Sequence, residues 1–310
     1  MIWKLFSRRK KKYRNSKIPI FGVQAAGKTY FIHSLAYFIS RRGLGSVVGD
    51  HSRDYMYRLK PALLRGEPLD ATSGFRDIEL QIDQVYFRDY EEIMTETHLR
   101  QYLPEAILEE EEESPEEEDR GSETVSCKLV LSTNDLSGLQ FTQAMMRLSE
   151  PAANLGGDAR TKPFLKVLNA CQGAIAVIDI VRKNISAEEF RKDRRDLIRQ
   201  NLAEQVVPLL RGVELALRNR KNSKQIFPLF LVFTKRDVHQ LDRQELTEIV
   251  WEIFPILLAR YKNQIWVRIH SVQNIGFGQN LDPEAYLQSH SQGLGMFLAD
   301  LNYSFKKITS

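Results

Sequence analysis

Residues 22–29 read GVQAAGKT, a complete match to the pattern Gly-x-x-x-x-Gly-Lys-Thr. The apolar stretch Ile18–Gly22 predicts a short buried strand, and apolar residues at helical spacing predict a helix over Lys28–Arg41. A glycine-containing turn from a strand into a helix gathers backbone N–H groups at the helix N-terminus, which favours phosphate oxygens. In this pattern Lys28 reaches the β- and γ-phosphates, and Thr29 offers its hydroxyl to Mg²⁺. The sequence therefore predicts a phosphate-binding loop.

The rest of the chain alternates predicted strands and helices. Further strands are expected at Ile78–Ile82, Cys127–Ser132, Ala174–Ile180, Leu229–Thr234 and Ile265–Ser271. Helices are expected at Glu188–Asn219, Arg243–Tyr261 and Pro283–Phe305. This alternation predicts βαβ units, hence an α/β fold with a mostly parallel central sheet covered by helices on both faces. We expect one domain over residues 18–310 with a long insertion at about 43–124.

Composition excludes several classes of protein. Hydrophobic residues make up 43% and charged residues 27% of the 310-residue chain, which argues against a wholly disordered or fibrous protein. No apolar run reaches the roughly 18 residues of a membrane-spanning helix. The first residues place apolar side chains ahead of a basic cluster, the reverse of a secretory signal. Cys127 and Cys171 have no metal-binding or disulfide spacing, so we expect a cytoplasmic protein with two buried cysteines.

The net charge of +4 conceals two opposed blocks. Residues 1–17 hold eight basic residues and no acid, whereas residues 105–119 hold ten acids and predict a solvated loop. The basic tail 1–17 is amphipathic because it opens with Ile2, Trp3, Leu5 and Phe6. It is either a solvated tail, a segment docked on the acidic block, or a peripheral contact with anionic lipid at the inner membrane surface. Nucleic acid has no use for the apolar tip, so no specific nucleic-acid partner is expected.

Three further motifs follow the phosphate loop in order. Asp135-Leu136-Ser137-Gly138 follows a predicted strand, where the acid can hold Mg²⁺ through water and the Gly138 N–H can contact the γ-phosphate. An apolar strand then runs into Thr234-Lys235-Arg236-Asp237, and the carboxylate of Asp237 can accept both the ring N–H and the amine of guanine. Ser271 ends the next strand, where a backbone N–H can meet the guanine carbonyl oxygen.

In their order and spacing these motifs resemble those of the TRAFAC-type P-loop GTPase superfamily, over about residues 18–305. The long insertion and Gly293-Leu294-Gly295 are most similar to bacterial double-GTPase-type domains. The resemblance implies a Ras-like G domain that uses GTP/GDP and Mg²⁺ as a molecular switch with a protein effector or regulator. The positions it assigns to the nucleotide are Gly22, Ala25, Ala26, Gly27, Lys28, Thr29, Tyr30, Asp135, Gly138, Thr234, Lys235, Asp237, Ser271 and Val272.

The sequence also departs from that family's pattern around the reacting phosphate. Leu139 stands where many small GTPases carry the water-orienting glutamine, and Gln140 comes one residue later. Gln24 replaces a usual glycine in the loop and either crowds the γ-phosphate or helps to position water. The catalytic candidates are therefore Lys28, Gln24 and Gln140, and a slow GTPase is expected. Thr72, ahead of Ser73, is the candidate for a third metal-binding residue beside Thr29 and Asp135.

Two other functions remain open on the sequence. One is a nucleotide-dependent interaction module with negligible intrinsic hydrolysis, and the other is a P-loop ATPase or kinase, for which Thr-Lys-Arg-Asp would be accidental. Asp179 ends a buried strand and is interpreted as a cap of the next helix rather than a nucleotide contact. His33 and His270 have no catalytic partner at a convincing spacing and are interpreted as core or surface residues.

Overall fold

The computed structural model describes residues 14–65, 75–82, 129–147, 165–166, 168–181, 186–273, 293–298, 300–301 and 304–305. Several sequence predictions lie outside these residues: the first 13 residues of the basic tail, Thr72, the acidic loop 105–119 and Cys127. Most of the helix expected at Pro283–Phe305 also lies outside them, although residues 293–298 are helical.

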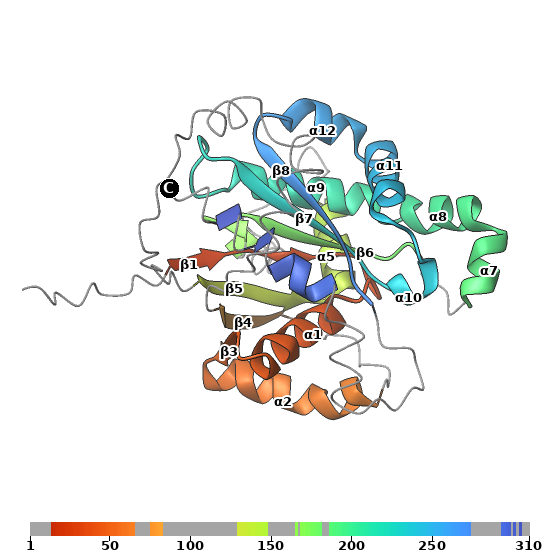
Figure 1. Ribbon diagram of the computed structural model, residues 1–310. Coiled ribbons are helices and arrows are strands. Elements are labelled where there is room, and N and C mark those ends of the chain that lie inside the picture. The colour runs from red at the N-terminus through yellow and green to blue at the C-terminus, as the bar shows by residue number, and fades with distance from the viewer. Residues whose placement is uncertain are drawn as a thin grey trace, which may run out of the picture.

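The described strands form two four-stranded sheets, which are the parallel half and the mixed half of the central strand layer (Figure 1). The parallel half has the order β2-β6-β7-β8, with β2 (Ile20–Phe21), β6 (Ala174–Ile178), β7 (Phe227–Phe233) and β8 (Ile265–Ser271). The mixed half has the order β1-β5-β4-β3, with β1 (Arg14–Lys17), β5 (Leu129–Leu136), β4 (Phe75–Ile82) and β3 (Gly45–Val48). In the mixed half β1 is parallel to β5, and β4 is antiparallel to both of its neighbours. Because only Ile18 and Pro19 separate β1 from β2, one stretch of chain contributes a strand to each half.

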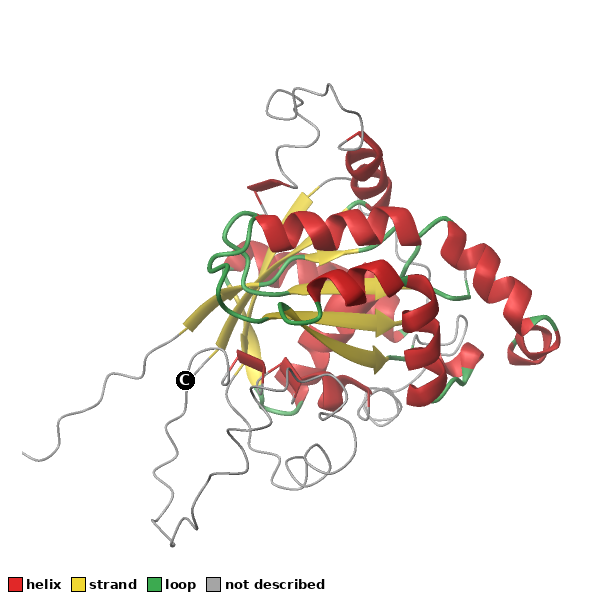
Figure 2. Ribbon diagram, turned by 90° about the horizontal axis from the view of Figure 1, so that it is seen from above, coloured by secondary structure: helices red, strands yellow, loops and turns green. Residues whose placement is uncertain are grey.

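Helices lie on both sides of the strands, which gives a three-layer α/β fold of the P-loop NTPase type. On one side lie α1 (Lys28–Arg41) and α2 (Asp50–Leu64), and on the other lie α9 (Val206–Arg218), α11 (Arg243–Ile253) and α12 (Pro255–Tyr261) (Figure 1). The remaining described helices are α5 (Gly138–Arg147), α7 (Ala187–Lys192), α8 (Arg194–Ala203) and α10 (Arg236–His239). Figure 2 shows the strands side by side beneath one helical layer. Among the described helices, none is long and apolar enough to cross a membrane.

Alternating residues of the central strands supply the cores on the two faces. In β7, Phe230 and Val232 belong to the core beneath α1, whereas Leu229, Leu231 and Phe233 belong to the core beneath α9 and α11. All residues of β6 and β7 are buried. Strands covered on both faces need apolar side chains in both directions, which is why their sequences are continuous apolar runs.

The structure corrects several expected boundaries. The segment Glu188–Asn219 forms three helices rather than one, and the first begins after Ser186, whose hydroxyl accepts the Glu189 N–H in a capping box. The segment Arg243–Tyr261 forms two helices because Pro255 lacks an N–H and begins α12. Residues 14–17, assigned to the basic tail, form β1 and pair with β5.

Candidate nucleotide-binding site

The loop between β2 and α1 has the backbone conformation that its sequence pattern requires. Ala25 and Gly27 have φ angles of 62° and 87°, both left-handed. A β-carbon on Gly22 would lie 2.6 Å from the carbonyl oxygen of Val177, so only glycine fits beside β6. The chain can therefore turn sharply from β2 into α1, leaving the first turn of α1 facing the loop.

Lys28 is folded back over this loop. Its side chain is buried, and its Nζ donates hydrogen bonds to the carbonyl oxygens of Gly22 at 3.0 Å and Val23 at 2.9 Å. A buried ammonium group needs such partners because desolvation disfavours its charge. The loop thus holds a cation over the backbone that the sequence assigns to phosphate binding. Thr29 is half-buried beside it, whereas Tyr30 is buried in the core, so its assigned contact is limited to its backbone.

The start of α5 contacts the phosphate loop. A β-carbon on Gly138 would overlap the backbone of Val23 and Gln24, which brings the Asp-x-x-Gly motif against the loop as predicted. Asp135 is the next-to-last residue of β5, inside the strand rather than after it, and its register partner on β4 is Arg76. Gln24, Leu139 and Gln140 are exposed. The structure therefore places both glutamine candidates at the solvent-facing side of this junction.

Thr234 connects the phosphate loop to the end of β7. Its Oγ1 donates to the carbonyl oxygen of Ala26 at 3.1 Å, and its Cγ2 is 3.2 Å from the position of a β-carbon on Gly27. The Thr234 side chain is fully buried. One hydroxyl therefore fixes the Thr-Lys-x-Asp motif against the loop across 208 residues of sequence.

Asp179 lies beside the Thr-Lys-x-Asp segment, and its interpretation as a cap of the next helix is wrong. Its carboxylate is fully buried, lies 2.7 Å from the Nζ of Lys235 and accepts the Val181 N–H at 2.8 Å. Ser186, not Asp179, caps α7. Gln205 also bonds both the N–H and the C=O of Asp179, at 3.1 and 2.6 Å. The missed signal was a single acid at the end of an apolar strand that neighbours the Thr-Lys-x-Asp strand.

Lys235 shows what this ion pair does. Its backbone is left-handed, with φ 63°, and its Nζ also donates to the Val181 carbonyl oxygen. The side chain is thereby drawn toward the end of β6, and α10 begins at the next residue. Asp237 lies half-buried in this short helix.

His239 joins α10 to the end of β8 and was not anticipated. Its Nδ1 accepts the Leu241 N–H at 3.0 Å, and its Nε2 lies 3.2 Å from the Ser271 Oγ. Burial lowers the pKa of His239 to about 4, so the ring is neutral at pH 7. The Arg236 N–H also donates to the carbonyl oxygen of Val272 at 3.1 Å, and the Val272 side chain is buried. The predicted base-binding segments therefore share one rigid corner.

The structure thus brings together four of the predicted motifs: the phosphate loop, Gly138, the Thr-Lys-x-Asp segment and the Ser271 loop. A phosphate loop in this three-layer α/β fold is the arrangement of P-loop NTPases. No protein family model matches the chain, and no curated protein matches it. Among solved structures, the chain is similar to Methanosarcina barkeri Roco2 RocCORdC bound to GDP, with 13% identity and a TM-score of 0.33. The match covers 97% of this chain and 52% of that chain, so this chain spans about half of its length.

Proposed function

We propose that this chain binds a guanine nucleotide with Mg²⁺ and hydrolyses GTP slowly as a nucleotide-controlled switch. The observation that carries the proposal is the hydrogen bond from Thr234 to Ala26, because it joins a phosphate loop to a base-recognition strand. A glycine-rich turn alone would not need a partner motif at that distance in sequence. The site is assembled from this chain's own residues, and the proposal rests on them.

The loop between β2 and α1 has groups that can bind the phosphates of a nucleotide. The Lys28 ammonium and the N-terminus of α1 lie at the loop and would bind the β- and γ-phosphates. The described residues hold no group of three or more His, Cys, Asp or Glu side chains suited to a metal ion. By the pattern of the motifs, Thr29, Asp135 and the phosphate oxygens would hold Mg²⁺, and when bound it would neutralise charge on the β- and γ-phosphates.

At the base end, Asp237 would accept the ring N–H and amine of guanine. Adenine offers neither in that pattern, and leaving buried acceptors unpaired is costly. The ion pair between Lys235 and Asp179 holds the backbone that leads into α10, and His239 holds Ser271 beside it. Base choice would therefore come from a corner whose side chains are already positioned.

Slow hydrolysis follows from the residues at the junction of the loop and α5. Leu139 has no hydrogen-bonding group, and its side chain is 50% exposed. Gln140 and Gln24 are exposed as well. Neither glutamine has a fixed partner among the hydrogen bonds found in the described residues, so ordering one of them over an attacking water would cost side-chain entropy.

The first test is competition between GTP and ATP for the purified chain, compared with Lys28→Ala. Loss of charge-assisted bonds to two phosphates should weaken binding on the order of 100-fold. Lys224→Ala, at an exposed lysine in the turn before β7, is the matched control and should bind normally. Binding of ATP as tightly as GTP would remove guanine recognition and favour the ATPase alternative.

The second test is Asp237→Asn. The amide replaces a carboxylate oxygen with a donor, so preference should move from GTP toward xanthosine triphosphate, whose ring offers a carbonyl where guanine has an amine. Affinity for both nucleotides is measured by calorimetry. Unchanged GTP affinity would show that Asp237 does not read the base.

A second candidate function is supported by the surface of α5. Leu139 and Met146 are 50% and 57% exposed and lie two turns apart on this helix. Two apolar side chains on a helix that begins at the phosphate loop suit a protein partner that senses the nucleotide. In that case the output is partner binding, and turnover by the isolated chain is negligible. GTP turnover by the isolated chain, compared with turnover in the presence of proteins encoded in the same operon, separates the two functions.

We also propose, from sequence alone, that residues 1–17 make a peripheral contact with anionic membrane. Each cation near anionic headgroups contributes about 1 kcal/mol, and the apolar tip can insert shallowly. Liposome flotation of the full chain is compared with a chain that starts at Arg14 and so keeps all of β1, in neutral and anionic lipid. Equal flotation of both chains would remove the membrane role, and with it a location at the inner membrane surface.

A further inference from the structure

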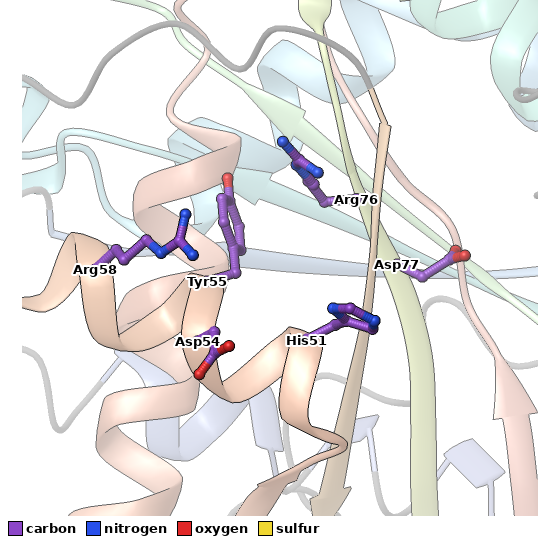
Figure 3. Close-up of a pocket in the computed structure, with 6 residues that line it drawn as sticks. All are labelled: His51, Asp54, Tyr55, Arg58, Arg76 and Asp77. Atoms are coloured by element: carbon purple, nitrogen blue, oxygen red, sulfur yellow. The ribbon is translucent and has the colours of Figure 1, made fainter.

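A polar cavity of about 420 Å³ lies between α2 and β4, outside the motifs that define the nucleotide site. It is lined by His51, Asp54, Tyr55, Arg58, Arg76 and Asp77 (Figure 3). None of these residues belongs to a motif that the sequence assigns to the nucleotide. Arg58 and Tyr55 come from α2, and Arg76 comes from the second position of β4.

The basic side chains of this cavity converge. In Figure 3 the guanidinium groups of Arg58 and Arg76 point toward the Tyr55 hydroxyl, whereas the carboxylates of Asp54 and Asp77 point away from it. Neither arginine has an ion-pair partner within the residues that the structure describes. Two like charges facing one space repel each other, so an anion between them would be bound favourably.

Two contacts place the cavity next to the predicted phosphate and metal groups. On the sheet, Arg76 and Asp135 are register partners, and Asp135 is the predicted metal-binding residue of β5. On the helices, the rings of Tyr55 and His33 lie 5.4 Å apart, and His33 stands one turn after Thr29 on α1. Helical side chains lean toward the N-terminus, so the His33 ring, which Tyr55 contacts, covers the turn that begins at Thr29.

The position of α2 is fixed against both neighbours. The buried Ser52 hydroxyl lies 3.4 Å from the Glu79 backbone N, on β4. Met56 of α2 is buried in the core that includes α1. The arginines of the cavity are therefore mounted on anchored elements, while their own side chains are exposed and able to turn toward a ligand.

We propose that Arg76 contacts the γ-phosphate of bound GTP, and that Arg58 is a second cation that attracts the same phosphate. The inference rests on the proposed nucleotide site. In hydrolysis the water oxygen bonds to the γ-phosphorus, and the bond from that phosphorus to the bridging oxygen breaks with its electron pair left on GDP. One water proton stays on the inorganic phosphate and the other passes to solvent. A planar guanidinium can bind two equatorial phosphate oxygens while charge shifts to the leaving oxygen.

This arrangement accounts for the absence of a glutamine directly after Asp-x-x-Gly. Charge stabilisation by an arginine in the same chain supplies part of what a water-orienting side chain gives elsewhere. It also gives α2 and β3 a role, because they carry Arg58 and brace the strand that carries Arg76.

The experiment uses the full chain and compares Arg76→Ala, Arg76→Lys, Arg58→Ala and the control Arg195→Ala, an exposed arginine of α8 on the other side of the sheet. The first measurement is the affinity for GDP and for the slowly hydrolysed analogue GTPγS, which needs no turnover. We expect Arg76→Ala to weaken GTPγS binding about 10-fold with GDP affinity unchanged, and Arg58→Ala to have a smaller effect of the same kind.

The second measurement is single-turnover GTP hydrolysis. We expect Arg76→Ala to slow it by about 10³-fold, the lower end of what a transition-state arginine contributes, with Arg76→Lys only partly restoring it. Equal loss of GDP and GTPγS affinity in Arg76→Ala would show a structural role and overturn the inference, as would unchanged affinity for both. If Lys28→Ala binds both nucleotides normally, the proposed function itself fails, which is a different result.

Discussion

The two halves of the sheet are built differently. In the parallel half, the seven residues of β7 are all buried between two helical layers. In the mixed half, β4 buries Ile78, Leu80 and Ile82 on the α1 side but exposes Asp77 and Glu79 on the other. The parallel half carries the segments predicted to bind the base, and the mixed half carries exposed polar side chains on the strand beside the predicted metal-binding residue Asp135. The segments predicted to bind the base therefore lie on strands packed on both faces, whereas β4 of the mixed half is packed on one face only.

The largest effect should come from breaking the buried ion pair of the parallel half. Lys235→Ala leaves the fully buried Asp179 carboxylate without its 2.7 Å partner. The nucleotide-free protein should lose about 3–5 kcal/mol of unfolding free energy, measured by urea titration. The double variant Lys235→Met with Asp179→Leu removes both charges and should recover most of that loss. Equal losses in the single and double variants would contradict an energetic coupling between the two residues.

Acid should weaken both halves of the molecule through two of its buried histidines, His33 beside the mixed half and His239 beside the parallel half. Burial lowers the pKa of His33, packed against α2, and of His239, beside β8, to about 4 in the folded protein. The unfolded histidines titrate near 6.5, so the unfolded chain binds more protons between pH 6.5 and 4. Stability is therefore present above pH 6.5 and lost as the pH falls, by on the order of 2–3 kcal/mol per histidine at pH 4.5.

Single variants assign this pH dependence to each half. Urea titrations from pH 7 to 4.5 should show that the unfolding free energy falls less steeply with pH in His33→Phe and in His239→Asn than in the unsubstituted protein. If the unfolding free energy falls equally steeply with pH in both variants and in the unsubstituted protein, other groups cause the acid sensitivity.

A smaller loss is expected at the joint between the phosphate loop and β7. Thr234→Val keeps the shape of the side chain but removes the hydroxyl that donates to Ala26. We expect a loss of about 1 kcal/mol in stability and a several-fold weaker affinity for GDP. Thr234→Ser retains the hydroxyl and should keep the affinity for GDP. If its GDP affinity falls as much as that of Thr234→Val, packing against Gly27 matters more than the hydrogen bond.

The smallest effect is expected at the corresponding joint of the mixed half. Ser52→Ala removes a long contact of 3.4 Å to the Glu79 backbone N, which should cost about 0.5 kcal/mol or less by urea titration. A loss as large as that of Thr234→Val would mean that α2 is fixed as firmly as the phosphate loop. The contrast between the two halves would then be wrong.

Sequence reasoning succeeded where the local pattern determines the structure. The helix Lys28–Arg41 and the strand Ile265–Ser271 have the predicted bounds, because apolar periodicity and full burial leave few alternatives. It gave no bounds for β3 and α2. The strand β3 has only four residues and is largely half-exposed, and α2 is polar and contains Pro61, so neither shows a strong apolar period.

The candidate site divides in the same way. The phosphate loop and Thr-Lys-x-Asp are contiguous motifs, and a spacing rule finds them. The partnership of Asp179 with Lys235 spans 56 residues and depends on β6 and β7 being neighbours, which no local pattern encodes. His239 follows the motif by only two residues, yet its importance appears only when β8 brings Ser271 beside it.

The ring of His239 also determines the direction of the hydrogen bonds at the end of β8. A backbone N–H can only donate, so the bond from Leu241 leaves Nδ1 without a hydrogen, and the neutral ring carries its proton on Nε2. The Nε2–H then donates to the Ser271 oxygen, so the O–H bond of Ser271 points away from the ring. The Ser271 hydroxyl is therefore left to donate its hydrogen away from the ring, and the group that complements it is a hydrogen-bond acceptor rather than a donor.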